Sequence, residues 1–257
     1  MNYTLITGAS SGLGSELASL FAEQGGGLIL VARQKDKLQQ VASALNARHH
    51  TKALIIQQDL SLSNAAEIVF EQVNQWKIPI DTLVNNAGFY VQGPFSATVW
   101  QREQELIQLQ CINLTKLTKL FLPGMVKRKT GRILNVCSTG SFMPGPFNAI
   151  YCAVKGYVLS FSEALAEELS GSGIQVTALC PGGINTSFQD LNKRKQSLIN
   201  PLMEASVVAQ KGYNGFMKGK RVVVPGLSNK IQVFAVRLLP RGIVAWLAGM
   251  AGSQSNK

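Results

Sequence analysis

Three side chains in this sequence have the types and the spacing that acid–base chemistry requires. Tyr151 and Lys155 are four residues apart, so on a helix they would lie on one face, one turn apart. A free tyrosine has a pKa near ~10 and is a poor base at neutral pH, but a nearby ammonium group would favour the phenolate and lower that pKa. Ser138, thirteen residues before Tyr151, could hydrogen-bond the oxygen of a carbonyl or alcohol on which charge develops.

A glycine-rich segment near the N-terminus is a second, independent indication. Gly8 would allow a sharp turn, Gly12 would let the backbone approach a pyrophosphate, and Gly14 would permit close packing of a helix on a sheet. The helix that begins near Gly12 would offer free N–H groups and the positive end of its dipole to phosphates. A glycine-rich turn or a Tyr-x3-Lys pair alone is weak evidence, because each occurs by chance. Together they predict an enzyme that moves a hydride with a dinucleotide. The full segment is Thr7-Gly8-Ala9-Ser10-Ser11-Gly12-Leu13-Gly14.

The residues after the second expected strand bear on the choice of cofactor. A carboxylate at this place would bind the ribose 2′-hydroxyl of NAD, whereas an arginine would accommodate the 2′-phosphate of NADP. The sequence has Arg33 here and no Asp or Glu in 28–35, which favours NADP(H) over NAD(H). Lys35 and Lys37 could reinforce the preference or could simply be solvated. Asp59 could meet the adenine edge or could cap the next helix.

Apolar runs of strand length alternate with longer segments of helical period. Strands are expected at 3–7, 28–32, 53–57, 81–85, 132–137, 174–180 and 221–224. Helices are expected at 12–24, 36–47, 64–75, 98–129, 149–170 and 203–217, and Pro123-Gly124 could break the fourth of them. The strand runs have few polar interruptions, which is typical of a sheet covered on both faces. The pattern predicts an α/β fold with a doubly wound, seven-stranded parallel sheet.

The C-terminal segment differs from the rest of the chain. Residues 1–227 are predicted to form a single dinucleotide-binding and catalytic domain, and 228–257 an apolar and basic helical extension of it whose two halves meet at Pro240. The extension could pack over the substrate mouth or form a subunit contact. It could equally lie on a membrane as a basic amphipathic helix.

Taken in order, these motifs resemble those of the short-chain dehydrogenase/reductase family over residues 1 to about 225. The resemblance implies a Rossmann-type fold and a homodimer or homotetramer built through the helices at 98–129 and 149–170. The matching motifs are the glycine-rich segment, Asp59-Leu60, Asn85-Asn86-Ala87-Gly88, Asn113, Ser138, Tyr151-Cys152-Ala153-Val154-Lys155, and Pro181-Gly182 followed by Thr186.

The resemblance also implies four catalytic roles. Tyr151 would be the general acid/base, and Lys155 would hold the nicotinamide ribose and tune the tyrosine. Ser138 would orient the carbonyl or alcohol, and Asn113 would keep a water for a proton relay to Lys155. From the residues alone, Asn113 could also be an ordinary helical asparagine.

The cofactor-binding set follows partly from the motifs and partly from the resemblance. Asn86, Ala87 and Gly88 would line the cofactor and support the sheet, although Asn86 could also be a turn former. Pro181, Gly182 and Thr186 would contact the nicotinamide side. The complete set is Gly8, Ser10, Ser11, Gly12, Leu13, Gly14, Arg33, Asp59, Leu60, Asn86, Ala87, Gly88, Tyr151, Lys155, Pro181, Gly182 and Thr186.

Composition limits the remaining possibilities. The net charge of +11 could serve an anionic cofactor, lipid or nucleic acid, but no RNA-binding or zinc-finger pattern is present, so nucleic acid is not expected as a partner. The cysteines, Cys111, Cys137, Cys152 and Cys180, lack metal-ligand spacing, and we predict reduced thiols and no metal site. Neither a secretory leader nor an apolar run of spanning length is evident, which favours a cytoplasmic protein that could contact a membrane peripherally.

The residues expected near the substrate are apolar, and no Arg or Lys closely follows Gly88 or Ser138 to clamp a carboxylate. We therefore expect a hydrophobic ketone, aldehyde or secondary alcohol as substrate. Two alternatives use the same fold without turnover: a nucleotide-sensing module and a membrane-peripheral scaffold. The expected mouth residues are Phe89, Tyr90, Phe95, Phe142, Met143, Phe147, Phe188 and Leu191.

Overall fold

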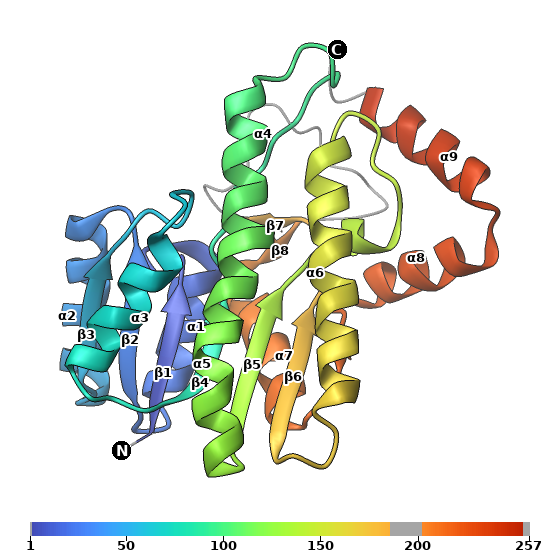
Figure 1. Ribbon diagram of the computed structural model, residues 1–257. Helices are drawn as coiled ribbons and strands as arrows, with labels where there is room; N and C mark the ends of the chain where they lie inside the picture. Colours follow the sequence, from blue (N-terminus) through green and yellow to red (C-terminus); the bar gives the residue numbers. More distant parts are fainter. Residues whose placement is uncertain (1, 186–201, 254–257) are drawn as a thin grey trace.

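The computed structural model describes residues 2–185 and 202–253 and has the predicted α/β architecture (Figure 1). At its centre is a seven-stranded parallel sheet of order β3-β2-β1-β4-β5-β6-β9. Because the winding direction reverses at β1, a ligand crevice is expected at the carboxyl ends of the strands there. The strands are β1 (Tyr3–Thr7), β2 (Gly27–Ala32), β3 (Ala53–Gln57), β4 (Ile80–Asn85), β5 (Gly131–Val136), β6 (Ile174–Leu179) and β9 (Val222–Val223).

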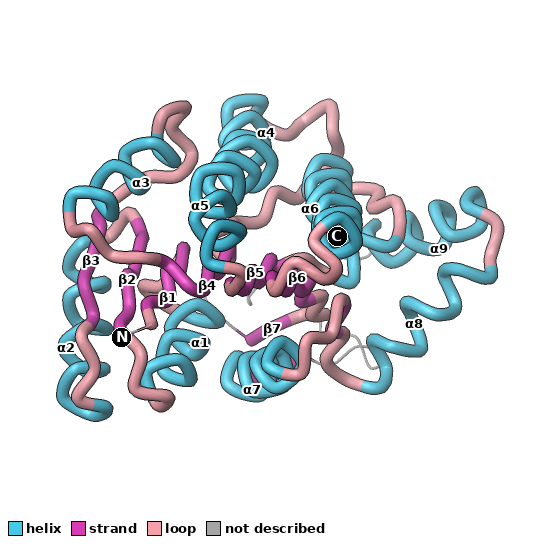
Figure 2. The backbone as a smooth tube through the Cα atoms, turned by 60° about the horizontal axis from the view of Figure 1, so that its bottom comes forward, coloured by secondary structure: helices cyan, strands magenta, loops and turns pink. Residues whose placement is uncertain are grey.

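Helices cover both faces of the sheet (Figure 2). One face packs against α1 (Gly12–Ala22), α2 (Lys35–His49) and α7 (Ala205–Met217). The other face packs against α3 (Ala65–Gln75), α5 (Leu114–Arg128) and α6 (Ala149–Glu168). The doubly wound sheet predicted from the alternation of elements is confirmed.

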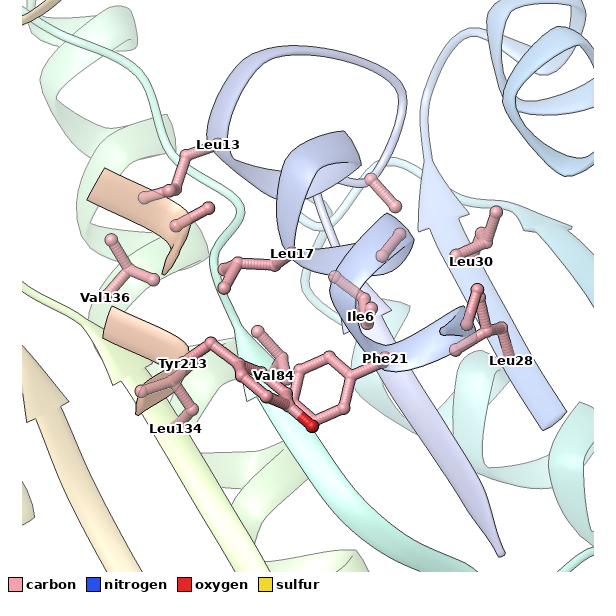
Figure 3. Close-up of a cluster of buried hydrophobic side chains, with 14 of the residues drawn as sticks. Ile6, Leu13, Leu17, Phe21, Leu28, Leu30, Val84, Leu134, Val136 and Tyr213 are labelled. Carbon is pink, nitrogen blue, oxygen red and sulfur yellow. The ribbon is translucent and has the colours of Figure 1, made fainter. Parts of the chain in front are cut away.

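The alternation of side chains along each strand produces two cores. In β2, Leu28 and Leu30 join the cluster under α1 and α7, whereas Ile29 and Val31 join the cluster on the opposite face. Figure 3 shows the first cluster, where the Phe21 ring meets the Tyr213 ring edge-on at 5.0 Å between centroids. Full burial of each such side chain contributes about 1.5–3 kcal/mol, so the two cores hold the strand ends in fixed register.

The long helix expected at 98–129 is interrupted, but not where the sequence suggested. It consists of α4 (Trp100–Ile107), a π-helical turn η1 (Gln108–Asn113) and α5, which continues through Pro123. The possible break at Pro123-Gly124 does not occur, because buried Phe121 and Met125 hold that part of α5 against the sheet. The π-helical turn occurs instead beside the sheet's carboxyl edge, where such turns often accompany functional sites.

Other boundaries shift by a few residues. The predicted helix at 203–217 begins at Ala205, because Met203–Glu204 (β8) pairs with Ile184–Asn185 (β7) in a small second sheet. A 3-10 turn, η2 (Thr139–Phe142), follows β5. The helical C-terminal extension is confirmed as α8 (Leu227–Leu238) and α9 (Arg241–Ser253), which are separated at Pro240.

Candidate active site

The carboxyl ends of the parallel strands open into a cavity of about 510 Å³. Its walls come from residues just after the strands, so segments far apart in sequence meet in one place. Of the predicted site residues, Thr186 lies outside the described residues, and Asn113 is not part of the cavity lining. The others line the cavity: Gly8, Ser10, Ser11, Gly12, Leu13, Gly14, Arg33, Asp59, Leu60, Asn86, Ala87, Gly88, Ser138, Tyr151, Lys155, Pro181 and Gly182.

The glycine-rich loop is shaped by two close approaches. Gly8 has a φ of +67°, and a Cβ placed there would lie 2.8 Å from the Ala87 Cα. A Cβ on Gly14 would lie 2.2 Å from the carbonyl oxygen of Gly8. Ser11 precedes α1 without a side-chain bond to the first-turn N–H groups. Those N–H groups therefore face the cavity as donors for an anion.

Asn86 braces the glycine-rich loop from the neighbouring strand. Its Nδ2 donates to the carbonyl oxygens of Thr7 at 2.9 Å and Gly8 at 3.2 Å. Its backbone N–H donates to the Thr7 Oγ1 at 3.0 Å. Asn86 is therefore more than a turn former, because it ties the end of β4 to the turn after β1.

The opposite end of the cavity is open and cationic. Arg33, Gln34 and Lys37 line it, and the Arg33 Nη1 lies 3.8 Å from the Asp59 Oδ2. Asp59 Oδ1 accepts hydrogen bonds from the Ser61 N–H at 2.9 Å and the Ser61 hydroxyl at 2.7 Å. The residue at the N-cap of α3 is Asn64, so the alternative of Asp59 as a helix cap is wrong.

The acid–base set lies at the other end, where Lys155 is buried and Ser138 and Tyr151 are partly exposed. Ser138 lies two residues after the end of β5. Its Oγ accepts a hydrogen bond from the Gly140 N–H at 3.1 Å, which fixes the side chain at the start of η2. Tyr151 and Lys155 project from α6, with the Lys155 Nζ 5.8 Å from the centroid of the Tyr151 ring. The Lys155 Nζ also donates to the carbonyl oxygen of Val136 at 2.8 Å. The predicted trio is thus assembled from β5 and α6.

Burial controls the protonation of this end. It raises the pKa of Tyr151 well above its ordinary value, and the hydrogen bond between Tyr151 and Ser138 offsets only part of that effect. Burial also lowers the pKa of Lys155 to about 8, against an opposing effect of the nearby Cys137 thiol. The predicted lowering of the Tyr151 pKa is therefore wrong: desolvation outweighs the hydrogen bond with Ser138, and the phenol is neutral at neutral pH.

Comparison with known proteins gives the family. Residues 2–197 match the family model described as short chain dehydrogenase. The chain belongs to the short-chain dehydrogenase family. It is 30% identical over 190 residues to the ketoacyl reductase HetN of Nostoc sp., covering 74% of this chain and 66% of that protein. It is 31% identical over 203 residues to a very-long-chain 3-oxoacyl-CoA reductase of Pyrenophora tritici-repentis, covering 77% of this chain and 60% of that protein.

Among solved structures, the chain is similar to a short-chain dehydrogenase of Sphingobium yanoikuyae in complex with NADPH. The TM-score is 0.84, the identity is 31%, and the match covers 95% of this chain and 94% of that one. The chain spans only 60% to 66% of the length of the two curated relatives. These matches show the family.

Asn113, the fourth member of the catalytic set implied by the family, lies at the end of the π-helical turn. Its Nδ2 donates to the carbonyl oxygens of Leu60 at 2.8 Å and Leu62 at 2.6 Å. Its Oδ1 is buried and has no hydrogen-bond partner in the described chain. The amide thus braces the connection after β3, and the relay through a water stays a prediction.

Two residues that the sequence reasoning missed contact the site loops. Gln110 is buried in the π-helical turn and lines the cavity; its Nε2 donates to the Ala87 carbonyl at 3.2 Å, and its Oε1 has no partner in the described chain. Buried Asn229 of α8 packs against Gly182, where an added Cβ would lie 2.4 Å from the Asn229 Oδ1. Neither residue belongs to a recognisable sequence motif. Gln110 reaches the cavity because of the π-helical turn, and Asn229 reaches Gly182 because α8 packs there.

Some of the aromatic residues expected at the substrate mouth lie at or beside the cavity. The Tyr90 ring packs edge-on against the Tyr151 ring at 4.8 Å between centroids, and Phe89 lines the cavity. Two arginines distant in sequence lie over aromatic residues expected at the mouth: the Arg102 Cζ is 4.2 Å from the centroid of the Phe89 ring, and the Arg237 Cζ is 5.7 Å from that of Phe142, which is not part of the cavity lining. Phe188 and Leu191 lie outside the described residues.

Proposed function

We propose that the protein is an NADP(H)-dependent oxidoreductase acting on the carbonyl/alcohol pair, and that it reduces apolar ketones or aldehydes with Tyr151 as general acid. One observation carries this proposal. The neutral phenol of Tyr151, hydrogen-bonded with Ser138 and close to Lys155, lines the same cavity as the glycine-rich loop. A phenol that keeps its proton at neutral pH suits proton donation, hence reduction.

The residues present fit a dinucleotide. The turn at Gly8 and the tight approach at Gly14 leave no room for a side chain, as expected where backbone must come close to a pyrophosphate. The first-turn N–H groups of α1 would bind the phosphates, Lys155 would bind the nicotinamide ribose, and Arg33 would bind a 2′-phosphate. The bound NADPH reported for the Sphingobium yanoikuyae relative supports the choice of NADP(H).

The cofactor, when bound, supplies the hydride; the chain's own residues manage the proton. Ser138 would donate a hydrogen bond to the carbonyl oxygen of the substrate and hold it beside the Tyr151 hydroxyl. Tyr151 would then transfer its proton to that oxygen as negative charge develops there. Lys155, held by the Val136 carbonyl, would replenish the proton and keep the ribose in place.

Several features support an apolar substrate. Aromatic side chains of Phe89 and Tyr90 lie beside the reactive phenol. The two curated relatives are named as reductases of ketoacyl and very-long-chain 3-oxoacyl compounds, which combine an oxo group with an apolar chain. We propose a long apolar carbonyl compound of this general kind as substrate.

The same proposal covers assembly and location. Residues 1–227 would form one catalytic domain, with 228–257 as its extension, in a cytoplasmic homodimer or homotetramer. The exposed side chains of Ile112, Val126 and Tyr157 on η1, α5 and α6 would supply apolar subunit contacts. Light scattering of the purified protein would distinguish these assemblies from a monomer.

Oxidation of NADPH with a panel of carbonyl compounds tests the function. The wild type should reduce apolar ketones or aldehydes in preference to small charged oxo acids. The variant Tyr151→Phe keeps the ring and its contact with Tyr90 but cannot give the proton. We expect kcat to fall about 10²–10⁴-fold while NADPH still binds.

The alternatives predict other results. A nucleotide-sensing module would bind NADPH without turning over any compound of the panel. A scaffold with idle residues would show equal background rates for the wild type and Tyr151→Phe. Either result would overturn the proposed reaction.

A further inference from the structure

The C-terminal helix α8 presents an apolar stripe to the outside of the molecule. Leu227, Ile231, Phe234 and Leu238 recur at helical spacing and are between 61% and 74% exposed. On the opposite side of the helix, Asn229 is buried against the Gly182 loop. The helix is therefore fixed to the domain by one face, and its most apolar face is left uncovered by the described chain.

Helix α9 continues this surface. Ile243, Trp246 and Leu247 are between 42% and 62% exposed, whereas Val244 is only 4% exposed. Gly249 lies against Pro146, in the loop that precedes the catalytic helix. Figures 1 and 2 show α8 and α9 together as an arm at the edge of the molecule beyond α6.

The charge of this arm restricts what could cover it. Lys230, Arg237 and Arg241 are exposed on or next to the apolar helices, and no acidic residue follows Glu204 in the sequence. A second copy docked arm to arm would place cations against cations without a carboxylate from either arm to pair them. An apolar, anionic surface has the complementary properties, and a bilayer containing anionic lipid is such a surface.

We propose that α8 and α9 dock on an anionic bilayer surface, and that the apolar carbonyl substrate enters the active site from that bilayer. The first part is independent of the proposed function, and the second rests on it. Arg237 lies 5.7 Å from the centroid of the Phe142 ring. Phe142 is the last residue of the 3-10 turn that follows Ser138. Ser138, just before this turn, lines the catalytic cavity, so the docked arm would bring lipid near that part of the cavity wall.

Flotation of the full-length protein with vesicles tests the docking. We expect it to float with vesicles of phosphatidylcholine and phosphatidylglycerol in equal amounts, less with phosphatidylcholine alone, and less as salt is raised. The double variant Lys230→Gln/Arg241→Gln should reduce the partition coefficient about fivefold for each cation removed. Failure of the wild type to float with anionic vesicles would overturn the proposal.

Matched substitutions identify the surface. Phe234→Asp/Trp246→Asp should lower binding at least about tenfold, because two aromatic anchors are lost and two anionic charges are added. The control Ile68→Asp/Val207→Asp changes exposed apolar residues on α3 and α7, which are not part of the arm, and should bind like the wild type. Equal loss in both variants, or in neither, would contradict docking through the arm. So would concentration-dependent dimerisation that only the arm variant abolishes, because the surface would then bind a second copy.

A spectroscopic measurement does not depend on the folding of these variants. Trp76→Phe/Trp100→Phe leaves Trp246 as the single tryptophan. Its emission should shift to the blue on vesicle addition and be quenched by brominated lipid. Unchanged emission would place Trp246 outside the bilayer and would overturn the proposal.

Kinetics separate substrate entry from the proposed function. Turnover of a water-soluble ketone should be the same in the wild type and Phe234→Asp/Trp246→Asp. Turnover of a long-chain carbonyl compound embedded in anionic vesicles should fall at least about tenfold in that variant, following its loss of binding. Equal turnover of the embedded compound by both proteins would refute entry from the bilayer. Absence of any NADPH-dependent turnover would refute the proposed function and, with it, substrate entry, but not the docking of the arm.

Discussion

The two ends of the cavity differ in how they are built. At the catalytic end, Lys155 is 3% exposed and its Nζ is held by the Val136 carbonyl. At the other end, the Arg33 side chain is 58% exposed and its Nη1 lies 3.8 Å from the Asp59 Oδ2. One end fixes its charged groups in an enclosed setting, and the other leaves them in water.

This difference determines what each end can contribute. In an enclosed setting, small changes of geometry or charge alter the protonation of the reacting groups, because little solvent is present to compensate. In an exposed setting, water and salt screen each charge, so an ion pair contributes about 0–1 kcal/mol and acts mainly on ligand choice. Substitutions at the catalytic end should therefore have large effects on rate, and substitutions at the open end small effects on cofactor preference.

After Tyr151→Phe, the largest effect is expected for Lys155→Met. This variant removes the charge next to Tyr151 and the hydrogen bond to Val136, and kcat for ketone reduction should fall about 10²-fold or more because the reacting groups lose their alignment. Stopped-flow or steady-state oxidation of NADPH measures it. Lys119→Met, an exposed lysine of α5, is the control and should leave kcat unchanged. Similar losses in both variants would mean that the enclosed setting of Lys155 is not what matters.

The pH dependence of the unfolding free energy should also reflect the burial of Lys155. The Lys155 pKa is lowered to about 8, so above that pH the folded state binds fewer protons than the unfolded state at this residue. The cost of burying the ammonium, on the order of 3 kcal/mol, is present below pH ~8 and is relieved as pH rises toward ~10. The buried thiols and Tyr151, whose pKa values are raised, oppose this gain above pH ~9.

A difference measurement isolates the lysine. Lys155→Met lacks the titrating group, so the unfolding free energy of wild type minus variant should increase between pH ~7 and ~9 in urea titrations. A difference that stays constant with pH would show that Lys155 is not held in a setting that disfavours its charge.

Gly14 tests whether the loop between the two ends depends on close packing. In Gly14→Ala the new methyl group would lie 2.2 Å from the Gly8 carbonyl oxygen, so the loop must shift, with an expected loss of about 1–3 kcal/mol in unfolding free energy and weaker NADPH binding. Gly242→Ala is the matched control: nothing lies within 4 Å of its added Cβ, and stability should rise by about 0.5–1 kcal/mol. Thermal unfolding and NADPH titration of both variants measure these effects. Equal stability and equal NADPH affinity of the two variants would contradict the steric argument.

Sequence was informative where a local pattern dictates a backbone shape. The glycine-rich loop, the seven strands and the Tyr151–Lys155 spacing each depend on residues within one short segment, and the structure brings them together as expected. Rules of this kind failed where tertiary packing competes with local preference. Pro123 did not break α5, because buried neighbours hold it, and the interruption moved to the π-helical turn that turns Gln110 and Asn113 inward.

The protonation states could not be predicted either. From sequence, the nearness of Lys155 suggested an acidic phenol, because spacing reports which groups are neighbours but not how much water surrounds them. The depth of Tyr151 depends on Tyr90, Ser138 and the loops around α6, which come from separate parts of the chain. For the same reason, the contact of Asn229 with Gly182 follows only from the path of α8 across the domain.

The smallest effect is expected at the open end, for Arg33→Ala. The lost charge-assisted contact with a 2′-phosphate should lower kcat/KM for NADPH up to about fivefold and leave kcat/KM for NADH unchanged, because only NADPH carries that phosphate. Steady-state kinetics with both cofactors measures the ratio, with Arg48→Ala, an exposed arginine at the end of α2, as control. The effect should shrink as salt is raised, since Arg33 is mostly exposed, whereas the effect of Lys155→Met should not. An equal loss with NADH would mean that Arg33 supports the loop rather than the phosphate. The proposed difference between a solvent-screened end and a buried end of the cavity would then not hold for Arg33.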